Sequence, residues 1–344
     1  MNANRFENAR TELRRQIDEG LFAGAVFADA DEGPVIAEGR QCFIEKQLPM
    51  TEKSVFDIAS VGKTATASLA ALLVADGKLD PDAPFTDYLP EHILAREHCA
   101  ITVRDLATHS GGFDNSKPYW GEADYAKFLE KLYAKRPVHK RGEMFDYACS
   151  NFIYLGKIIK KLTGLDLDTA ARKMLWGPLG MTHTTWNPVP DDGNVVEFSP
   201  DTYAGTGTRK IGDHNDLSCH QSPVPMGNGS IFTTAGDMRL YLSDMLHRRH
   251  FPKAYYDLLF AESFAKGGVR RTFGWDMPAE NSPAMLHPDL GFSNSAICHQ
   301  GWTGPAIIVD PERHFAGVFL GSKTGDYEKS KRGRMVVLAK LMGA

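Results

Sequence analysis

Ser60 and Lys63 are the residues whose types and spacing most directly suggest covalent chemistry. They follow a short run with strand character, Val55–Ala59, and open an apolar run with helical character, Thr64–Ala75. A serine at a helix start and a lysine one turn later place a hydroxyl and an amine on one face. That layout is typical of a serine activated by a neighbouring amine, so the segment predicts a hydrolase that works through an acyl-serine.

Two other motifs compete with this interpretation. The Ser-x-x-Lys spacing recurs at Ser263–Lys266, but no strand precedes this copy and two glycines follow it, so we interpret it as a helix end. Gly62-Lys63-Thr64 also matches the end of a phosphate-binding loop. The first glycine of such a loop would fall at Asp57, where a carboxylate would repel a phosphate. The sequence therefore argues against a nucleotide site.

A lysine base also needs a second proton carrier for the leaving group, for which tyrosine is a common choice. Tyr147 is the candidate, because it lies just before a predicted helix, Phe152–Thr163, and so could reach into a cleft between domains. The third element is His299–Gly304, whose glycines permit close backbone approach. A strand beside the nucleophile can supply a backbone N–H to an oxyanion. Taken singly, each of these two elements is better explained by packing.

The elements that must position these residues show strands at both ends of the chain and helices between them. The predicted strands are Ala23–Ala30, Pro34–Glu38, Ala306–Asp310 and Phe315–Leu320. The predicted helices run from the N-terminus to about Glu19 and over Thr64–Asp76, Thr102–Thr108, Glu122–Ala134, Asn151–Leu162, Asp168–Leu175, Gly236–His247 and Glu328–Met342. This order predicts one sheet built from both chain ends, with a helical domain inserted.

Composition excludes several classes of protein. The 344 residues are 42% hydrophobic and 24% charged, which is ordinary for a soluble enzyme, and the net charge of −4 argues against a nucleic-acid partner. No apolar stretch is long enough for a membrane span and no export signal is visible, so we expect a cytoplasmic protein. No His/Cys/Asp cluster has metal-ligand spacing, so no metal or other cofactor is expected. The sequence does not indicate the oligomeric state.

The cysteines carry little information beyond their redox state. No two of them form a C-x-x-C pair, and their number is odd, which fits reduced thiols better than a disulfide framework. They are Cys42, Cys99, Cys149, Cys219 and Cys298.

Together, the Ser60–Lys63 motif, Tyr147 and the His299–Gly304 segment resemble the serine β-lactamase/penicillin-binding-protein superfamily. The resemblance is to its class C β-lactamase-like branch, which includes family VIII carboxylesterases and D-aminopeptidase-type enzymes. It extends from about Gly20 to Leu320 and includes the segments Gly77–Asp80, Tyr88–Pro90, Ile101–Gly112 and Gly227–Met238.

This resemblance implies an α+β, β-lactamase/DD-peptidase-like fold, in which helices flank an antiparallel sheet made from both chain ends. Residues 1–60 and 265–344 would form the sheet domain, and residues 61–264 an inserted, mainly helical domain. The active site would lie at their interface.

The resemblance also implies roles for individual residues. Ser60 would be the acylated nucleophile, with Lys63 and Tyr147 as the proton-transfer pair. The backbone N–H groups of Ser60 and Trp302 would form the oxyanion hole. His299 would replace the lysine of the family's Lys-Thr-Gly motif.

The substrate would contact His299, Gly301, Trp302 and Cys149. The literal Lys323-Thr324-Gly325 lies beyond the strand Phe315–Leu320 and receives no role. Tyr119, Trp120 and Trp302 are candidate cleft walls, although such aromatic residues are at least as often core.

Cys149 departs from the family pattern, which usually has Tyr-x-Asn at this point. A thiol is a poor hydrogen-bond donor and acceptor compared with an amide. We therefore expect an esterase acting on small esters or amides rather than an efficient β-lactamase. A β-lactamase or D-amino-acid peptidase, a non-catalytic binding protein on this scaffold, and Cys149 as an independent nucleophile stay open. An ordinary α/β-hydrolase is excluded, because no Gly-x-Ser-x-Gly occurs in the chain.

Overall fold

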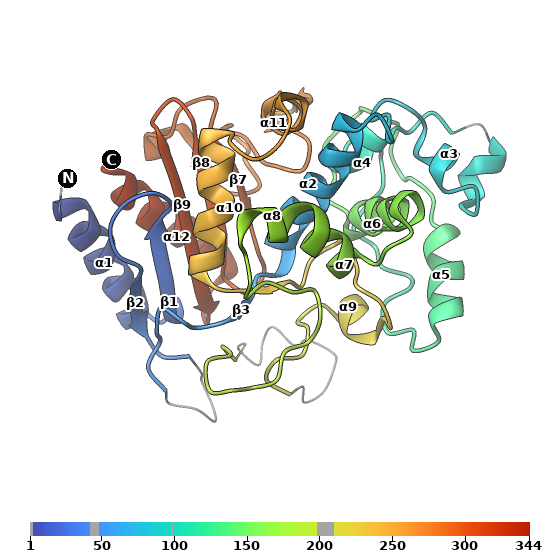
Figure 1. The fold of residues 1–344 in the computed structure, drawn as a ribbon. Helices are drawn as coiled ribbons and strands as arrows, with labels where there is room; N and C mark the ends of the chain where they lie inside the picture. Colours follow the sequence, from blue (N-terminus) through green and yellow to red (C-terminus); the bar gives the residue numbers. More distant parts are fainter. Residues whose placement is uncertain (1–2, 42–47, 98, 198–209) are drawn as a thin grey trace.

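The computed structural model describes residues 3–41, 48–97, 99–197 and 210–344 (Figure 1). Its central feature is a five-stranded antiparallel sheet with the strand order β2-β1-β9-β8-β7. Because β1 pairs with β9, the sheet is built from both chain ends, as predicted, and the fold is α+β. The strands are Phe22–Asp29 (β1), Ile36–Gly39 (β2), Ile297–Gln300 (β7), Ala306–Asp310 (β8) and Phe315–Lys323 (β9).

Helices cover both faces of this sheet, which explains why its central strands are apolar on both sides. α1 (Ala3–Asp18) and α12 (Tyr327–Met342) lie against one face, and α10 (Ala235–His247) lies against the other (Figure 1). Successive side chains of a strand point to opposite faces. Ile307 and Ile308 of β8 accordingly belong to two separate hydrophobic cores.

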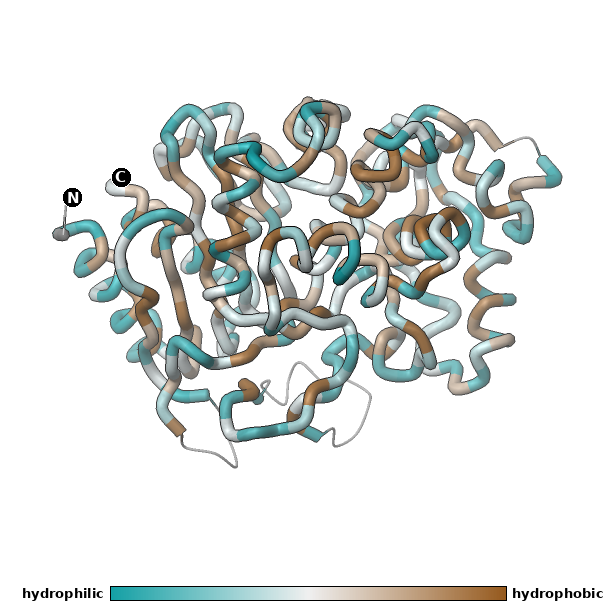
Figure 2. Tube along the Cα trace, in the orientation of Figure 1, coloured by the Kyte–Doolittle hydropathy of each residue, from teal (hydrophilic) through white to brown (hydrophobic). Residues whose placement is uncertain are grey.

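The other helices gather beside the sheet around α2 (Gly62–Ala75). Every residue of α2 from Gly62 to Leu73 is buried, because α6 (Cys149–Thr163) and α11 (Lys253–Phe260) pack against it. A helix covered all round needs no polar face. Figure 2 shows hydrophobic segments running through both the sheet and this helical part.

The helices expected between Thr64 and His247 are present, with their ends shifted by a few residues. The segment predicted as Asp168–Leu175 is divided between α7 (Leu167–Ala171) and a π-helical turn, Arg172–Trp176. α10 belongs to residues 61–264, which we expected to form the inserted helical domain, yet it packs on the sheet. The division into two domains stays a prediction. The remaining helices include Phe85–Tyr88 (α3), Val103–Thr108 (α4), Tyr125–Tyr133 (α5), Leu167–Ala171 (α7), Gly177–Leu179 (α8) and Leu217–Gln221 (α9).

The interpretation of Ser263–Lys266 as a helix end is wrong. Phe264–Lys266 is a strand, β5, which pairs with β6 (Val269–Arg271) in a short hairpin. The two glycines between them have φ values of +62° and +73°, a backbone region that favours glycine. They form the hairpin turn rather than a helix cap.

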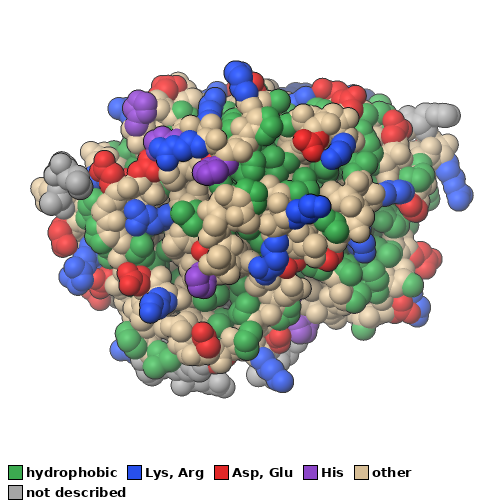
Figure 3. Space-filling view, viewed as in Figure 1, with side chains coloured by type: hydrophobic (Ala, Val, Ile, Leu, Met, Phe, Trp, Pro, Cys, Tyr) green, Lys and Arg blue, Asp and Glu red, His purple; other side chains and the backbone are tan. Residues whose placement is uncertain are grey.

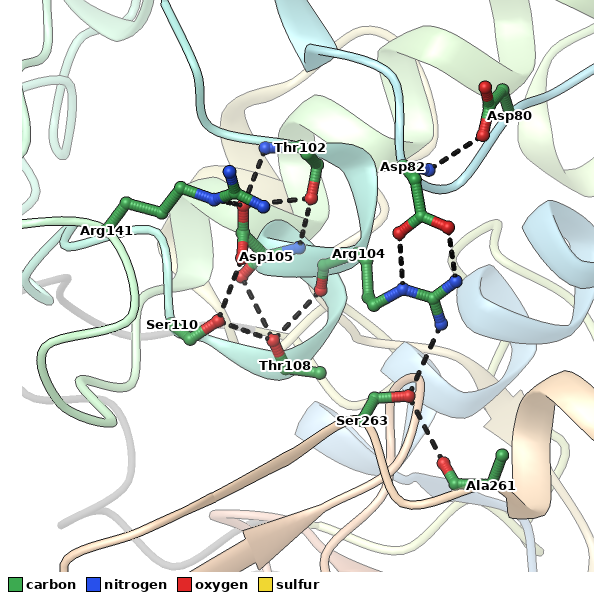
Figure 4. Close-up of polar contacts among 10 residues, drawn as sticks. All are labelled: Asp80, Asp82, Thr102, Arg104, Asp105, Thr108, Ser110, Arg141, Ala261 and Ser263. Carbon is green, nitrogen blue, oxygen red and sulfur yellow. Dashed lines mark hydrogen bonds and ion pairs between the residues drawn. The ribbon is translucent and has the colours of Figure 1, made fainter.

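Asp105 links α4 to the long segment that leads to Tyr147 (Figure 4). Its carboxylate accepts from the backbone N–H and the hydroxyl of Thr102, at 2.7 and 2.8 Å, and so completes a capping box at the start of α4. The same carboxylate accepts from Arg141 Nε at 2.5 Å. One buried side chain therefore fastens the start of α4 to Arg141, in the segment that leads to Tyr147.

Arg104, on the same helix, joins the helical part to the β5–β6 hairpin (Figure 4). Its guanidinium donates to both carboxylate oxygens of Asp82, at 2.7 and 2.8 Å. Its Nη1 also lies 3.4 Å from the hydroxyl of Ser263. The second Ser-x-x-Lys copy thus contributes a structural contact.

The surface carries charges of both signs, and Figure 3 shows them interspersed over the face in view. In the part of the chain that the structure describes, no helix is both long and apolar enough to cross a membrane. Cys99, Cys149, Cys219 and Cys298 are free thiols, and Cys42 lies outside the described residues.

Candidate active site

Ser60 lies on a single 3₁₀ turn, Ala59–Val61, between a two-residue strand (β3, Phe56–Asp57) and α2. The Asp57 carboxylate fixes this turn by accepting from the backbone N–H groups of Ala59 at 2.7 Å and Asn215 at 2.8 Å. Ala59 has a φ of +45°, which is unusual for a residue with a Cβ. The strand–turn–helix setting predicted for Ser60 is present.

The structure brings Ser60, Lys63 and Tyr147 together. Lys63 Nζ lies 3.1 Å from Ser60 Oγ, and the Tyr147 hydroxyl donates to the same oxygen at 2.8 Å. Lys63 is fully buried and also donates to the backbone oxygen of Asn228 at 2.5 Å. Burial, reinforced by Cys149, raises the pKa of Tyr147 above its ordinary value, so this hydroxyl keeps its proton at neutral pH.

His109 supports the ring of Tyr147. It ends α4 with a φ of +57°, and its ring centroid lies 4.5 Å from that of Tyr147. Its Nδ1 accepts from the backbone N–H of Ala148 at 3.2 Å and from Asn151 Nδ2 at 3.0 Å. Burial and the nearby cations lower the pKa of His109 well below its ordinary value, so the ring is neutral. Asn151, in the first turn of α6, thus helps to orient this histidine.

These groups open into a cleft of about 500 Å³ between the helical part and the sheet edge. Of the predicted substrate-binding residues, Cys149, His299 and Trp302 line it, whereas Gly301 is not among the lining residues. Of the predicted walls, Trp120 and Trp302 line it, whereas Tyr119 is fully buried against Phe128. The lining includes Ser60, Asn115, Lys117, Trp120, Tyr147, Cys149, Asp216, Asn228, Arg271, Asp276, His299, Trp302, Tyr327 and Lys331.

The turn Gly301–Gly304 follows β7, the edge strand of the sheet, and packs directly against the Ser60 segment. A Cβ on Gly301 would lie 2.5 Å from the backbone oxygen of Ile58, so glycine is required for this approach. Thr303 Oγ1 donates to the backbone oxygen of Asp57 at 2.8 Å. The turn and the serine are therefore held in fixed relation.

α12 holds the other side of this turn through Arg334. The fully buried guanidinium donates from Nη1 to the backbone oxygens of Gly301 at 2.7 Å and Pro305 at 2.9 Å. Among the described residues, neither the N–H of Ser60 nor that of Trp302 donates to a protein acceptor. The two N–H groups that we predict for the oxyanion hole thus have no competing acceptor in the described part of the chain.

Lys323 of the literal Lys-Thr-Gly sequence does not line the cleft. It is buried at the end of β9, and its ammonium group lies 4.2 Å from the centroid of the Trp302 ring. It therefore backs Trp302 through a cation–π contact.

His299 lies on β7 and is only 2% exposed. Its Nδ1–H donates to the backbone oxygen of Gln300 at 3.0 Å, which leaves Nε2 as an acceptor. Burial, Arg271 and Lys63 lower its pKa well below the ordinary value, so the ring is neutral. Within the described chain, Nε2 has no hydrogen-bond partner.

Cys149 begins α6 and is 6% exposed. Its Sγ lies 4.0 Å from Lys63 Nζ, at the limit of a hydrogen bond to sulfur. Its backbone N–H donates to Asn115 Oδ1 at 3.2 Å. The Cys149 thiol therefore lies beside the Lys63 amine but does not form the strong hydrogen bond that the oxygen of an amide side chain would form.

Five charged residues of the lining were not foreseen: Lys117, Asp216, Arg271, Asp276 and Lys331. Lys117 Nζ lies 3.7 Å from Asp216 and stacks over Trp120 at 4.7 Å. Burial opposes ionisation of Asp216, but Lys117 and Lys63 lower its pKa below the ordinary value. No local motif marks these residues, since their positions depend on the loops that carry them. The described residues contain no group of three His, Cys, Asp or Glu side chains that could hold a metal ion.

Comparisons with known proteins give a consistent result. The sequence model of a family described as Beta-lactamase matches residues 9–341. The chain is 25% identical over 315 residues to a protein of Escherichia coli K12 named "Putative D-alanyl-D-alanine carboxypeptidase", covering 81% of this chain and 71% of that protein. It is 27% identical over 355 residues to the N-acetylmuramyl-L-alanine amidase of Bacillus subtilis strain 168, covering 90% and 79%. A solved β-lactamase structure from Sulfitobacter sp. EE-36 has a TM-score of 0.78 at 20% identity, with 98% of each chain covered, and so has the same fold.

Proposed function

Since this chain belongs to the beta-lactamase family, we propose that it is a serine hydrolase that forms an acyl-enzyme on Ser60. The observation that carries the proposal is the convergence of Lys63 Nζ and the Tyr147 hydroxyl on one oxygen, Ser60 Oγ, at 3.1 and 2.8 Å. A serine needs such a neighbour to become a nucleophile at neutral pH.

In the proposed acylation step, Lys63 accepts the proton of Ser60 as Oγ attacks the carbonyl carbon of the substrate. The N–H groups of Ser60 and Trp302 stabilise the negative charge that develops on the carbonyl oxygen. Tyr147 then donates its proton to the leaving group and is reprotonated from Lys63. Water attacks the acyl-serine in the second half, with the same two side chains carrying the proton in reverse.

We further propose that small esters are better substrates than amides. An amine leaving group needs firm positioning for its protonation, whereas an alcohol or phenol leaves more readily. Cys149 makes only a marginal contact with Lys63, at 4.0 Å, which supports the ester preference.

The names of the two curated relatives favour a second candidate, an amidase or D-amino-acid peptidase. Its substrates would be amides rather than esters, cleaved by the same acyl-serine chemistry. Nitrocefin, a D-alanyl-D-alanine peptide and p-nitrophenyl butyrate, compared at equal enzyme concentration, separate a β-lactamase, a peptidase and an esterase.

The primary test is hydrolysis of p-nitrophenyl butyrate by wild type, Ser60→Ala and Ser263→Ala. Ser263 is a matched control, because it belongs to the second Ser-x-x-Lys copy and lies on the hairpin. We expect activity and fluorophosphonate labelling to disappear only in Ser60→Ala, with circular dichroism unchanged. A folded wild type that neither cleaves an ester or amide nor takes the label would instead support a non-catalytic binding protein.

A further inference from the structure

Lys157 is a partly buried amine of α6 that is not among the residues lining the active-site cleft and takes no part in the proposed mechanism. Its side chain contacts α5, at the end of the molecule remote from the sheet (Figure 1). Nζ donates to the Tyr125 hydroxyl and lies 4.9 Å from the centroid of that ring. Lys157 also lines a small pocket with mostly apolar walls, which include Ile153, Leu167, Val224, Pro225 and Met226.

Lys157 lacks the counter-charge that a buried amine normally has. Among the described residues no carboxylate forms an ion pair with it, whereas Lys161, on the next turn of α6, pairs with Glu91 at 2.9 Å. Of the described residues that line the pocket, only Asp166 is acidic, and its carboxylate accepts from the backbone N–H and the hydroxyl of Thr169, at 3.0 and 2.8 Å. A phenol accepts a hydrogen bond but does not neutralise an ammonium charge.

This environment makes Lys157 a better nucleophile than an ordinary lysine. Burial, and then the charge of Lys160, lower the pKa of Lys157 from 10.5 to about 8. At pH 7.5 about a quarter of the molecules therefore carry an unprotonated amine, against about 0.1% for an ordinary lysine. Only the unprotonated amine can attack a carbonyl carbon.

Lys160 adds a second positive charge at the same pocket. It lies three residues further along α6, is exposed, and has no ion-pair partner in the described part of the chain. Asp166 offsets only one of the two lysine charges, so the pocket attracts a small anionic reagent. An acyl phosphate has this negative charge, a reactive carbonyl carbon and a stable leaving group.

We propose that Lys157 is a modification site, acylated at Nζ by a small acyl phosphate. The unprotonated amine attacks the carbonyl carbon, and an N–C bond forms as the C–O bond to the phosphate breaks. Phosphate leaves with the electron pair of that bond, and the nitrogen releases one proton to water. The product is an uncharged amide, so the pocket loses one positive charge. This site is separate from Ser60 and does not depend on the proposed function.

The test treats the full-length protein with acetyl phosphate at pH 7.5 and follows the acetylated fraction of each lysine by peptide mass spectrometry. We expect Lys157 to react about tenfold faster than Lys161, the matched lysine of the same helix, because its larger unprotonated fraction outweighs its partial burial. The rate at Lys157 should level off above pH 8, whereas the rate at Lys161 should keep rising to pH 9. Equal rates at the two lysines overturn the proposal.

A second reagent, acetic anhydride, tests the preference for an anionic donor. The ratio of Lys157 to Lys161 acetylation should be larger with acetyl phosphate than with the uncharged anhydride, and the exposed-site variant Lys160→Gln should remove this difference. The same ratio with both reagents would overturn the assignment to an acyl phosphate. Ser60→Ala should be acetylated at Lys157 as fast as wild type, so the result at Lys157 and the result of the ester assay are independent.

Discussion

His92 makes the stability of this protein depend on pH in the mildly acidic range. Its side chain is 1% exposed and sits among the rings of Phe85, Phe113 and Tyr154. Nδ1 accepts from the backbone N–H of Leu94 at 3.2 Å, and Nε2 donates to the Tyr154 hydroxyl, also at 3.2 Å. These contacts suit the neutral ring, and burial, with Arg136, lowers the pKa of His92 from 6.5 to about 4.

The sign and size of the effect follow from these values. Above pH 6.5 the His92 ring is neutral in both the folded and the unfolded chain, so its full contribution to the free energy of unfolding is present. Between pH 6.5 and about 4 the unfolded chain binds a proton that the folded chain does not, so stability is lost as the pH falls. The total loss is about 3 kcal/mol, of which about 2 kcal/mol has accrued at pH 5.

The assay is urea unfolding at pH 7.5 and pH 5.0 for wild type and His92→Asn, whose Oδ1 can still accept from Leu94. The variant should be less stable at pH 7.5 but lose about 2 kcal/mol less than wild type on acidification. If wild type and His92→Asn lose the same free energy of unfolding between pH 7.5 and pH 5.0, His92 is not the source of the pH dependence.

Three further predictions concern the active site. Tyr147→Phe should lower kcat for p-nitrophenyl butyrate by about 10²–10⁴-fold without changing the unfolding midpoint, because only the hydroxyl bonded to Ser60 is lost; a smaller loss would assign leaving-group protonation elsewhere. Cys149→Asn should raise the ratio of anilide to ester hydrolysis about tenfold, since an amide oxygen can accept from Lys63 where the thiol lies 4.0 Å away, and Cys149→Ser should leave the ratio nearly unchanged. Gly229→Ala should cost about 2 kcal/mol or more in urea unfolding, because φ is +147° and a Cβ would lie 2.5 Å from a backbone oxygen; wild-type stability would contradict the required glycine.

Local sequence signals were sufficient to predict an element where the residues of one segment determine its structure. The Ser60 turn and α2 could be predicted because an apolar helical run directly follows a short strand. The sheet built from both ends could be predicted because 306–309 of β8 and 315–321 of β9 contain no polar side chain. Tyr147 was singled out by its place before a predicted helix and received its role only from the family resemblance, since its position depends on contacts with His109 and Ser60.

The β5–β6 hairpin, where we predicted a helix end at Ser263–Lys266, shows where local sequence signals fail. β5 has only three residues, none of them buried, so it has no hydrophobic alternation. A pair of glycines ends a helix as readily as it turns a hairpin, and only pairing with β6 decides between them. Arg271 was missed for the same reason, because the strand register that separates it from Arg270 is not visible in two consecutive arginines.

The two hydrogen bonds from Arg334 to the Gly301–Gly304 turn have a consequence for how the protein is made. A nascent chain contains Ser60, Lys63 and Tyr147 long before residue 334 has been synthesised. Until α12 has docked, the turn lacks both hydrogen bonds from Arg334 and is held only by contacts such as that of Thr303 with Asp57. We therefore expect fragments that stop before this helix to lack the proposed activity although they contain Ser60, Lys63 and Tyr147, so that activity would appear only when segments from both ends of the chain have closed the sheet.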